Sequence, residues 1–316
     1  MIKRCRTWFL LSISMCFSIP GPAEVNPARI QRGSHEAQLG DVRIHYVVAG
    51  HGPVVFVTSV GWGLGTTLYQ NGLKPLEDHF TVVYVDERGN GESSLPIDLK
   101  EMSTSVMADD LDRLRIYLGL DGIDLVGHSS GGTIALEYAE RHPTHLAKAV
   151  LIDPRILGDE GEKEIAEIEA IWKDDPKYKD AIISLKNSDE HPKTDAAITQ
   201  ILTSYLNLYF SKPNIYMPIF TKQGGSSAVI SAVTNEAHNA ADDKLHRQQA
   251  KDYDVIRAKI LIINGTVDFI CPYQPAQRLH NAVPGSVLEL YANVGHFPWI
   301  EEPDRFIRSL IEFLNS

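Results

Sequence analysis

The residues Gly127-His128-Ser129-Ser130-Gly131 constrain the fold of this chain more than any other feature, because of what stands on either side of them. The apolar run Ile123 to Val126 precedes them and predicts a buried strand, and a helical pattern follows. A serine between two such elements lies in a strained, tight turn, where a side chain two residues to either side would collide with the neighbouring strand or helix. The spacing G-x-S-x-G therefore predicts a sharp strand–turn–helix connection that lifts the Ser129 hydroxyl off the end of a strand.

Short apolar runs alternate with helical patterns from residue 40 to about 154, and the alternation resumes near residue 253. This rhythm predicts an α/β fold with a mostly parallel sheet flanked by helices. The strands that we expect are Ile44 to Ala49, Val54 to Thr58, Thr81 to Val85, Ile123 to Val126, Ala147 to Ile152, Lys259 to Ile263 and Val287 to Leu290. Among the helices that we expect, one carries the stripe Met107, Leu111, Leu114 and Leu118 before a C-cap at Gly119. A second runs from about Pro275 to Ala282, and a third starts at Pro303 with Ile307, Leu310, Ile311 and Leu314 on one face.

The middle of the chain is charged, helix-rich and aromatic, unlike the parts on either side. We therefore divide the chain into an α/β core of residues 24–154 and 253–316 and a helical insertion of residues 155–252. One catalytic domain with an insertion fits a chain of 316 residues. A helical lid over the carboxyl ends of the strands is where we expect substrate selection.

Residues 1–23 have the pattern of an export signal. Basic residues precede an apolar run, and a small-residue stretch follows: Lys3, Arg4 and Arg6, then Trp8 to Ile19, then Pro20 to Ala23. The run is interrupted by serines and is shorter than the ~20 apolar residues that span a bilayer, so we expect no stable membrane insertion. The pattern predicts a secreted or periplasmic protein, whereas a misassigned start would make the protein cytoplasmic.

Charge and cysteine content exclude several classes of function. The formal net charge is -11, and Lys and Arg nowhere gather into a stripe, so we expect no nucleic-acid partner. Removal of a signal would leave Cys271 as the one thiol, which allows no intramolecular disulfide. No grouping of Cys and His has metal-ligand spacing, so we expect neither a metal nor an organic cofactor.

A serine hydroxyl is a poor nucleophile at neutral pH and needs a base that a third group holds in place. In a fold of this kind the acid and then the histidine follow the serine, each after a late strand. Asp268 follows the expected strand Lys259 to Ile263, and His296 follows the expected strand Val287 to Leu290. We therefore expect Ser129, Asp268 and His296 to act together. Asp153, directly after the strand that ends at Ile152, is the rival acid.

Attack on a carbonyl carbon places negative charge on the carbonyl oxygen, which two backbone N–H groups can stabilise. We expect one from Ser130, the residue after the nucleophile. The other comes from the glycine-rich loop after Thr58, where either Gly61 or Trp62 is the donor.

With these motifs the chain resembles the α/β-hydrolase family, and within it the proline iminopeptidase (prolyl aminopeptidase) branch. The resemblance extends from about residue 36 over nearly the whole chain outside the insertion. It includes Asp86 to Ser93, similar to the D-x-R-G-x-G-x-S segment of that branch, Gly265 to Pro272 as G-x-x-D-x-x-x-P, and Gly295-His296-Phe297. The resemblance implies a serine hydrolase that cleaves an ester or amide bond of a small-molecule or short-peptide substrate through an acyl-enzyme on Ser129, most like a proline iminopeptidase-type aminopeptidase. We expect the Asp86 segment to shape a loop beside the site; its arginine and carboxylates are second-choice site residues.

The resemblance supports the chemistry more strongly than the specificity, because the loop after Thr58 lacks the His-Gly-Gly-Pro of typical iminopeptidases. Those enzymes bind a free amine through carboxylates, mainly in the lid, and Glu236 near His238 is the candidate counterpart here. The alternatives are a carboxylesterase or lactonase, and a non-catalytic ligand-binding protein on the same scaffold.

Overall fold

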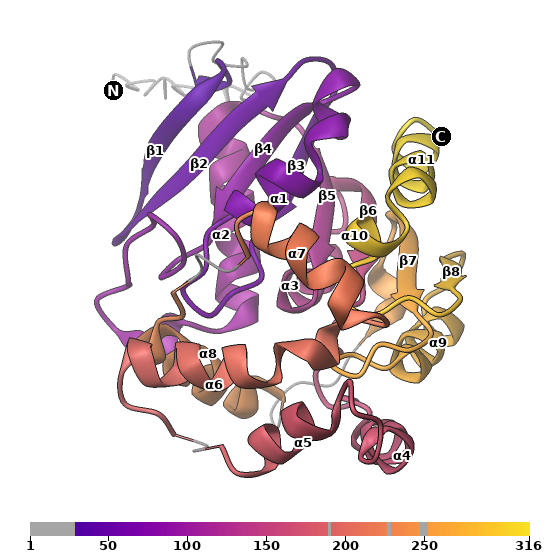
Figure 1. Cartoon of the computed structure of the whole chain (residues 1–316). Helices are drawn as coiled ribbons and strands as arrows, with labels where there is room; N and C mark the ends of the chain where they lie inside the picture. The colour runs from indigo at the N-terminus through magenta and orange to yellow at the C-terminus, as the bar shows by residue number, and fades with distance from the viewer. Residues whose placement is uncertain (1–28, 189–190, 226–228, 247–251) are drawn as a thin grey trace, which may run out of the picture.

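The computed structural model describes residues 29–188, 191–225, 229–246 and 252–316. The expected export signal at residues 1–23 lies outside the described residues. An eight-stranded sheet in the order β1-β2-β4-β3-β5-β6-β7-β8 forms the centre of the molecule (Figure 1). The strands are β1 Gly33–Leu39, β2 Val42–Gly50, β3 Val54–Thr58, β4 Thr81–Asp86, β5 Ile123–His128, β6 Leu146–Ile152, β7 Lys259–Gly265 and β8 Val287–Tyr291.

Strand β2 is antiparallel to both of its neighbours, and every pair from β4 through β3 to β8 is parallel. The predicted α/β fold with a mostly parallel sheet is confirmed. Strand β1 was not predicted, because its sequence is largely polar and its first residues are exposed. It pairs only with β2 at the edge of the sheet, where one exposed face requires few apolar residues.

Helices cover both faces of the sheet. Along β7 the side chains of Ile260 and Ile262 join one apolar cluster and those of Leu261 and Ile263 join the other, as the two-residue period of a strand requires. The first cluster holds α2, α3 and α9, and the second holds α1, α10 and α11. The helices of the core are α1 Thr67–Gly72, α2 Thr104–Leu118, α3 Ser130–Arg141, α9 Tyr273–Ala282, α10 Pro298–Glu301 and α11 Pro303–Leu314, with short 3-10 turns η2 Lys74–Asp78, η3 Leu99–Glu101 and η6 Tyr253–Val255.

Helix α2 begins and ends where its capping residues stand. The Ser103 side chain accepts the Val106 N–H at its start. Gly119 lies at φ 75° and ψ 32° at its end, so the predicted C-cap is confirmed in the left-handed conformation that glycine tolerates best. The predicted stripe from Met107 to Leu118 is buried.

Between β6 and β7 the described residues form helices and loops without a strand. Of these inserted helices, α4, α5, α6 and α8 lie beyond one end of the sheet strands, whereas α7 is drawn across the middle of the view between α1 and α10 (Figure 1). Their bounds are α4 Glu162–Trp172, α5 Lys179–Lys186, α6 Asp195–Tyr205, η4 Leu206–Tyr209, α7 Pro213–Lys222 and α8 Ala232–His246.

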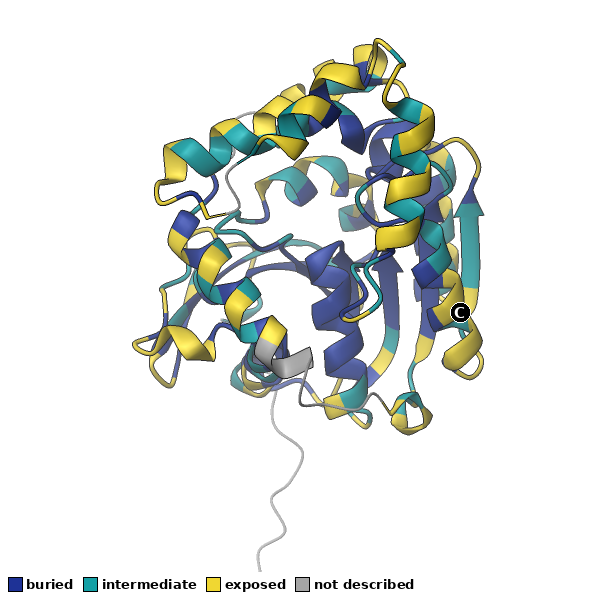
Figure 2. Ribbon diagram, turned by 90° about the horizontal axis from the view of Figure 1, so that it is seen from below, coloured by how far each residue is buried: buried dark blue, intermediate teal, exposed yellow. Residues whose placement is uncertain are grey.

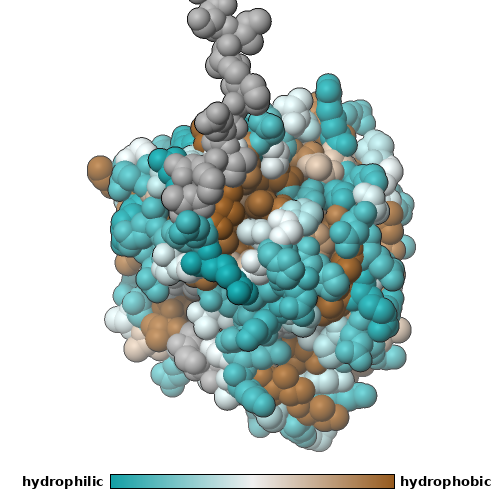
Figure 3. All heavy atoms as spheres, turned by 90° about the horizontal axis from the view of Figure 1, so that it is seen from above, coloured by the Kyte–Doolittle hydropathy of each residue, from teal (hydrophilic) through white to brown (hydrophobic). Residues whose placement is uncertain are grey.

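Burial falls off from the sheet outwards. Buried residues gather in the strands and on the helix faces that touch them, and exposed residues mark the outer faces of the helices (Figure 2). The face shown in Figure 3 is mainly hydrophilic, with hydrophobic side chains in separate patches. Among the described residues, no helix combines the length and the apolar character that crossing a bilayer requires.

The closing helix α11 offers a test of the packing. Leu310 is fully buried in the cluster with α1 and α10, whereas Arg308 of the same helix is exposed. We expect Leu310→Ala to lower the free energy of unfolding by about 2–5 kcal/mol, from the lost burial and the cavity left behind. Arg308→Ala should change it by less than ~0.5 kcal/mol. Urea denaturation of the two variants measures both values; equal effects would contradict the packing of α11.

Candidate active site

Ser129 lies in a strained turn between β5 and α3. Its backbone has φ 55° and ψ -120°, in the region that side chains rarely adopt. A Cβ added at Gly127 would lie 2.1 Å from the Gly131 carbonyl oxygen, and one at Gly131 would lie 2.4 Å from the Thr58 Oγ1. The two glycines therefore permit the close backbone approach that the G-x-S-x-G spacing predicts.

We expect Gly127→Ala to destabilise the fold, because the Cβ would meet rigid backbone rather than a flexible side chain. Gly285→Ala is the control: Gly285 has φ 73° but nothing within 4 Å of an added Cβ, so it reports backbone strain alone. We expect about 1–2 kcal/mol for the control and a clearly larger loss for Gly127→Ala. Thermal unfolding compares the two; an equal loss would show that Gly127 is not sterically required.

Asp268 and His296 lie against each other in the structure. Asp268 follows β7, and its Oδ1 accepts the backbone N–H groups of Ile270 at 2.8 Å and Cys271 at 3.0 Å. Its Oδ2 accepts from His296 Nδ1 at 2.7 Å. Both side chains are buried. Because a carboxylate only accepts, Nδ1 carries the proton and Nε2 of the neutral ring is left as a basic nitrogen.

His296 is also held by the inserted helices. Its backbone N–H donates to the Tyr209 carbonyl oxygen at 2.8 Å, and the two rings meet edge to face with centroids 5.3 Å apart. No sequence motif points to Tyr209, because this contact joins η4 to the loop after β8. The structure thus brings Ser129 and His296 to the wall of one cavity, with Asp268 behind the histidine.

The rival acid Asp153 has a different partner. It follows β6, and its Oδ1 accepts the Gly265 N–H at 2.8 Å. The carboxylate that bonds His296 is that of Asp268.

The loop after β3 approaches Ser129 through Gly61 and Trp62, which lie at φ 83° and 61°. The Gly61 N–H is directed at Ser59 Oγ, 3.4 Å away, and Trp62 lines the cavity beside Ser129. Ser59 in turn is held by the buried Glu87, which accepts the Ser59 N–H at 2.9 Å and bonds its hydroxyl.

The rest of the Asp86 to Ser93 segment makes contacts that hold loops together. Asp86 Oδ1 accepts the Thr66 N–H and hydroxyl, at 2.8 and 3.0 Å. Arg88 forms a two-fold hydrogen bond with Asp110, at 2.6 and 2.9 Å. These partners agree with the structural role expected for the segment.

Glu87 gives a pH-dependent test of this loop. Burial raises its pKa to about 7 from an ordinary 4.5, against the hydrogen bonds from Ser59. Between these values the folded chain keeps a proton that the unfolded chain has released, so the stability falls as the pH rises from 4.5 to about 7. We expect Glu87→Gln, whose amide can bond both Ser59 groups, to remove this part of the slope. Denaturant unfolding from pH 4 to 8 measures it; the exposed Glu312→Gln is the control, and an unchanged slope in Glu87→Gln would contradict the shift.

Two cavities flank Ser129, and they differ in polarity. The first has about 300 Å³ and is lined mainly by apolar and aromatic side chains, with no Asp or Glu among its described lining residues. Its apolar walls include Val60, Leu64, Leu202, Leu206, Tyr209, Phe220 and Phe297. The second, also about 300 Å³, shares Trp62 and Ser129 and has isoleucine and proline walls as well, but its lining includes the charged and polar side chains Arg155, Asp159, Glu160, Glu162 and Asn239.

Glu236 does not lie at either cavity. Its side chain is exposed, and its carboxylate pairs with Lys193 Nζ at 3.2 Å. The neighbouring His238 is buried and bonds Asp242 at 3.1 Å. The structure thus gives no support to a contact between Glu236 and a substrate amine at Ser129.

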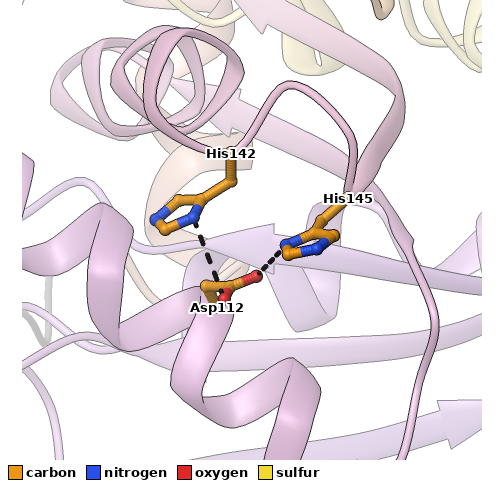
Figure 4. A group of neighbouring side chains, drawn as sticks. All are labelled: Asp112, His142 and His145. Atoms are coloured by element: carbon orange, nitrogen blue, oxygen red, sulfur yellow. Dashed lines mark hydrogen bonds and ion pairs between the residues drawn. The ribbon is translucent and has the colours of Figure 1, made fainter. Parts of the chain in front are cut away.

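Asp112, His142 and His145 form a group with the spacing of metal ligands, away from Ser129 on α2 and the α3–β6 loop (Figure 4). Their ligand atoms lie within 4.8 Å of one another. However, the Arg115 guanidinium bonds Asp112 at 2.6 Å and approaches His145 at 3.2 Å. A fixed positive charge in the group disfavours a cation, so we interpret it as an ion-pair network.

Comparison with known proteins places these features in context. A family model described as the alpha/beta hydrolase fold matches residues 53–303. Proline iminopeptidase PfmaB from Pestalotiopsis fici is 22% identical over 297 residues, 88% of this chain and 98% of the relative. A proline iminopeptidase from Lactobacillus delbrueckii subsp. bulgaricus is 25% identical over 241 residues, 74% of this chain and 80% of the relative.

Among solved structures, an esterase (EaEST) from Exiguobacterium antarcticum superposes with a TM-score of 0.66. It is 21% identical and the match covers 90% of this chain and 100% of that chain. The structural likeness shows a shared fold. The expected resemblance to proline iminopeptidases is confirmed at low identity.

Proposed function

The chain belongs to the α/β-hydrolase fold family, and from this premise we propose that it is a serine hydrolase that cleaves carboxylic esters with an apolar acyl group. The observation that carries the proposal is one cavity with Ser129 and His296 in its wall and an otherwise mainly apolar lining. Asp268 completes the set, because it fixes the orientation of His296 from behind.

In the proposed reaction His296 Nε2 takes the proton from Ser129 as its oxygen attacks the carbonyl carbon. Asp268 holds the ring and stabilises the imidazolium that forms. His296 then gives the proton to the leaving group, and a water that it activates releases the acid from Ser129. Each step uses only groups of this chain, water and the substrate.

Two backbone N–H groups stabilise the oxyanion in this proposal. Ser130 supplies one as the first residue of α3, where the helix dipole also favours negative charge. For the other we choose Trp62 over Gly61, because the Gly61 N–H is directed at Ser59 Oγ.

The polarity of the first cavity supports an apolar acyl group over an amine-bearing one. A protonated amine taken out of water requires a carboxylate partner, since an unpaired buried charge is strongly unfavourable. The first cavity offers none among its described lining residues. Aliphatic and aromatic walls instead favour a substrate part that leaves water without needing a partner.

A second candidate is an aminopeptidase, which the carboxylates of the second cavity favour. Two of them already have cationic partners: Glu160 bonds Arg155 at 2.8 Å and Asp159 bonds Arg278 at 2.5 Å. Glu162 also lines this cavity and could accept an amine beside Ser129. The resemblance to proline iminopeptidases agrees with this candidate.

We expect Ser129→Ala to lower kcat/KM for p-nitrophenyl esters by at least ~10⁴-fold, because no other group replaces the nucleophile. Ser204→Ala, which removes an exposed hydroxyl on α6, should leave it unchanged. A fluorophosphonate probe followed by mass spectrometry should label Ser129 alone. Retention of the esterase rate by Ser129→Ala would refute the serine hydrolase, and tight ligand binding without labelling would favour a binding protein.

A paired substrate panel separates the two candidates. The panel contains p-nitrophenyl esters of increasing acyl length and prolyl and alanyl arylamides with free and blocked amines. We expect the highest kcat/KM for esters of apolar acids, with little effect of a free amine. Efficient cleavage of prolyl arylamide that disappears when the amine is blocked, and falls in Glu162→Gln, would establish the aminopeptidase instead.

A further inference from the structure

Asp153 is fully buried at the carboxyl end of β6 and makes two hydrogen bonds to β7. Its backbone N–H donates to the Ile263 carbonyl oxygen at 2.8 Å, and its Oδ1 accepts the Gly265 N–H at 2.8 Å. Its backbone lies at φ 41°, which is strained for a residue with a side chain. Such strain persists only where the surrounding structure holds the residue in place, and strained residues cluster at functional sites. Asp153 therefore occupies a defined position that the proposed mechanism has not used.

The second carboxyl oxygen of Asp153 has no hydrogen-bond donor among the described residues. This Oδ2 is buried without a donor. Gly265 joins the two aspartates, because its N–H donates to Asp153 Oδ1 at 2.8 Å and its carbonyl oxygen accepts the Asp268 N–H at 3.4 Å. The Asp268 carboxylate therefore lies beside the Asp153 side chain, and its charge acts on it. An unsatisfied buried acceptor is costly, and two ionised carboxylates side by side in a buried site would repel each other. A single proton between them removes both problems.

The other charged groups around the pair do not offer an alternative. Glu301 adds a further carboxyl group, whose charge also raises the pKa of Asp153 and so disfavours its ionisation. The Cys271 thiol lies beside both aspartates, and burial raises its pKa, so it stays neutral. The neighbouring cation, Arg155, is bonded to Glu160. Among the described groups around the pair, no positive charge is thus free to balance a second carboxylate.

We propose that Asp153 keeps its proton and donates it to Asp268, so that a carboxylic acid paired with a carboxylate, rather than one carboxylate alone, orients His296. This role rests on the proposed function, in which His296 is the base. Asp153 is a positioning residue, because it acts on the reacting atoms through Asp268 and His296. The carboxylate that bonds His296 directly is still that of Asp268.

The local charges and hydrogen bonds agree with this assignment. Burial, and then the charge of Asp268, raises the pKa of Asp153 well above its usual range. With the added donor, Asp268 accepts from Ile270, Cys271, His296 and Asp153. Four donors fix the plane of the Asp268 carboxylate and, through it, the orientation of the His296 ring.

The variant Asp153→Asn tests the protonation state directly. The amide that this substitution introduces would donate to Asp268 through its NH₂ group and accept the Gly265 N–H through its carbonyl oxygen, as a protonated aspartic acid does. We therefore expect Asp153→Asn to keep kcat/KM for the ester within about three-fold of wild type, with an unchanged pH profile. Asp268→Asn should lose ~10⁴-fold, because it removes the partner of the His296 proton.

The variant Asp153→Ala removes the proposed donor to Asp268. The shift of the pH profile that this loss predicts is opposite in direction to the shift that the loss of a negative charge would cause. Asp268 would become more basic and stabilise the imidazolium of His296 more strongly, so the acid limb of kcat/KM against pH should move to higher pH. If Asp153 were ionised in the wild type, its removal would move that limb to lower pH in both Asp153→Ala and Asp153→Asn. Thermal unfolding of each variant checks that the fold is intact, and Asp153→Asn keeps the test decisive if Asp153→Ala does not fold.

Infrared difference spectroscopy of Asp153→Asn against the wild type gives a readout without catalysis. We expect the wild type to show the carbonyl band of a buried protonated carboxylic acid at neutral pH, and Asp153→Asn to lack it. Absence of the band, or a loss of activity in a folded Asp153→Asn as large as in Asp268→Asn, would overturn the proposal. Failure of the serine hydrolase itself appears separately, as full activity in Ser129→Ala.

Discussion

The strained turn at Ser129 is the constraint on which the rest of the site depends. A positive φ at a residue with a side chain costs about 1–3 kcal/mol, so it persists only where neighbours hold it. Here the Ser129 N–H donates to the Ile152 carbonyl oxygen at 2.9 Å, and its own carbonyl oxygen accepts the N–H groups of Gly132 at 3.0 Å and Arg155 at 3.2 Å. The position of Ser129 is thus set by the end of β6 as much as by its own strand, and the parallel pairing of β5 with β6 is a condition for the site.

The same arrangement, a residue with positive φ that is hydrogen-bonded to the neighbouring strand, recurs one strand further along the sheet. Asp153 is the residue after Ile152, has a positive φ, and is tied to β7 through Ile263 and Gly265. Three neighbouring parallel strands are therefore fastened to one another at their carboxyl ends by hydrogen bonds to the backbone. These ties explain how residues that are more than 100 positions apart meet within hydrogen-bonding distance. They also bring two carboxyl groups together, because Asp153 follows β6 and Asp268 follows β7.

Features that depend on short stretches of sequence could be predicted, and features that depend on packing could not. The parallel strands follow from apolar runs, and the turn at Ser129 from two glycines at fixed spacing. Strand β1 was missed because an edge strand needs few apolar residues. Glu236 was chosen for its nearness to His238, but on α8 these residues are two positions apart and do not share a face: one is exposed and the other buried. The preference for Trp62 over Gly61 as the donor depends on the position of Ser59 Oγ, at which the Gly61 N–H is directed. Glu87 holds this hydroxyl, and the two residues are too far apart in the sequence for the contact to be predicted.

In the proposed mechanism, the shape of the apolar cavity and the position of His296 depend on the same segment of the insertion. The inserted helices supply Leu206 and Phe220 to the apolar cavity, and the same segment supplies the Tyr209 carbonyl oxygen that holds the His296 backbone. A movement of η4 that widens the cavity would therefore also move the imidazole relative to Ser129. Because small displacements of a catalytic group reduce the rate steeply, the insertion cannot adapt freely to a larger substrate. Trp62 lines both cavities together with Ser129. A change at Trp62 would therefore alter which cavity a substrate occupies more readily than a change in the shape of the helices.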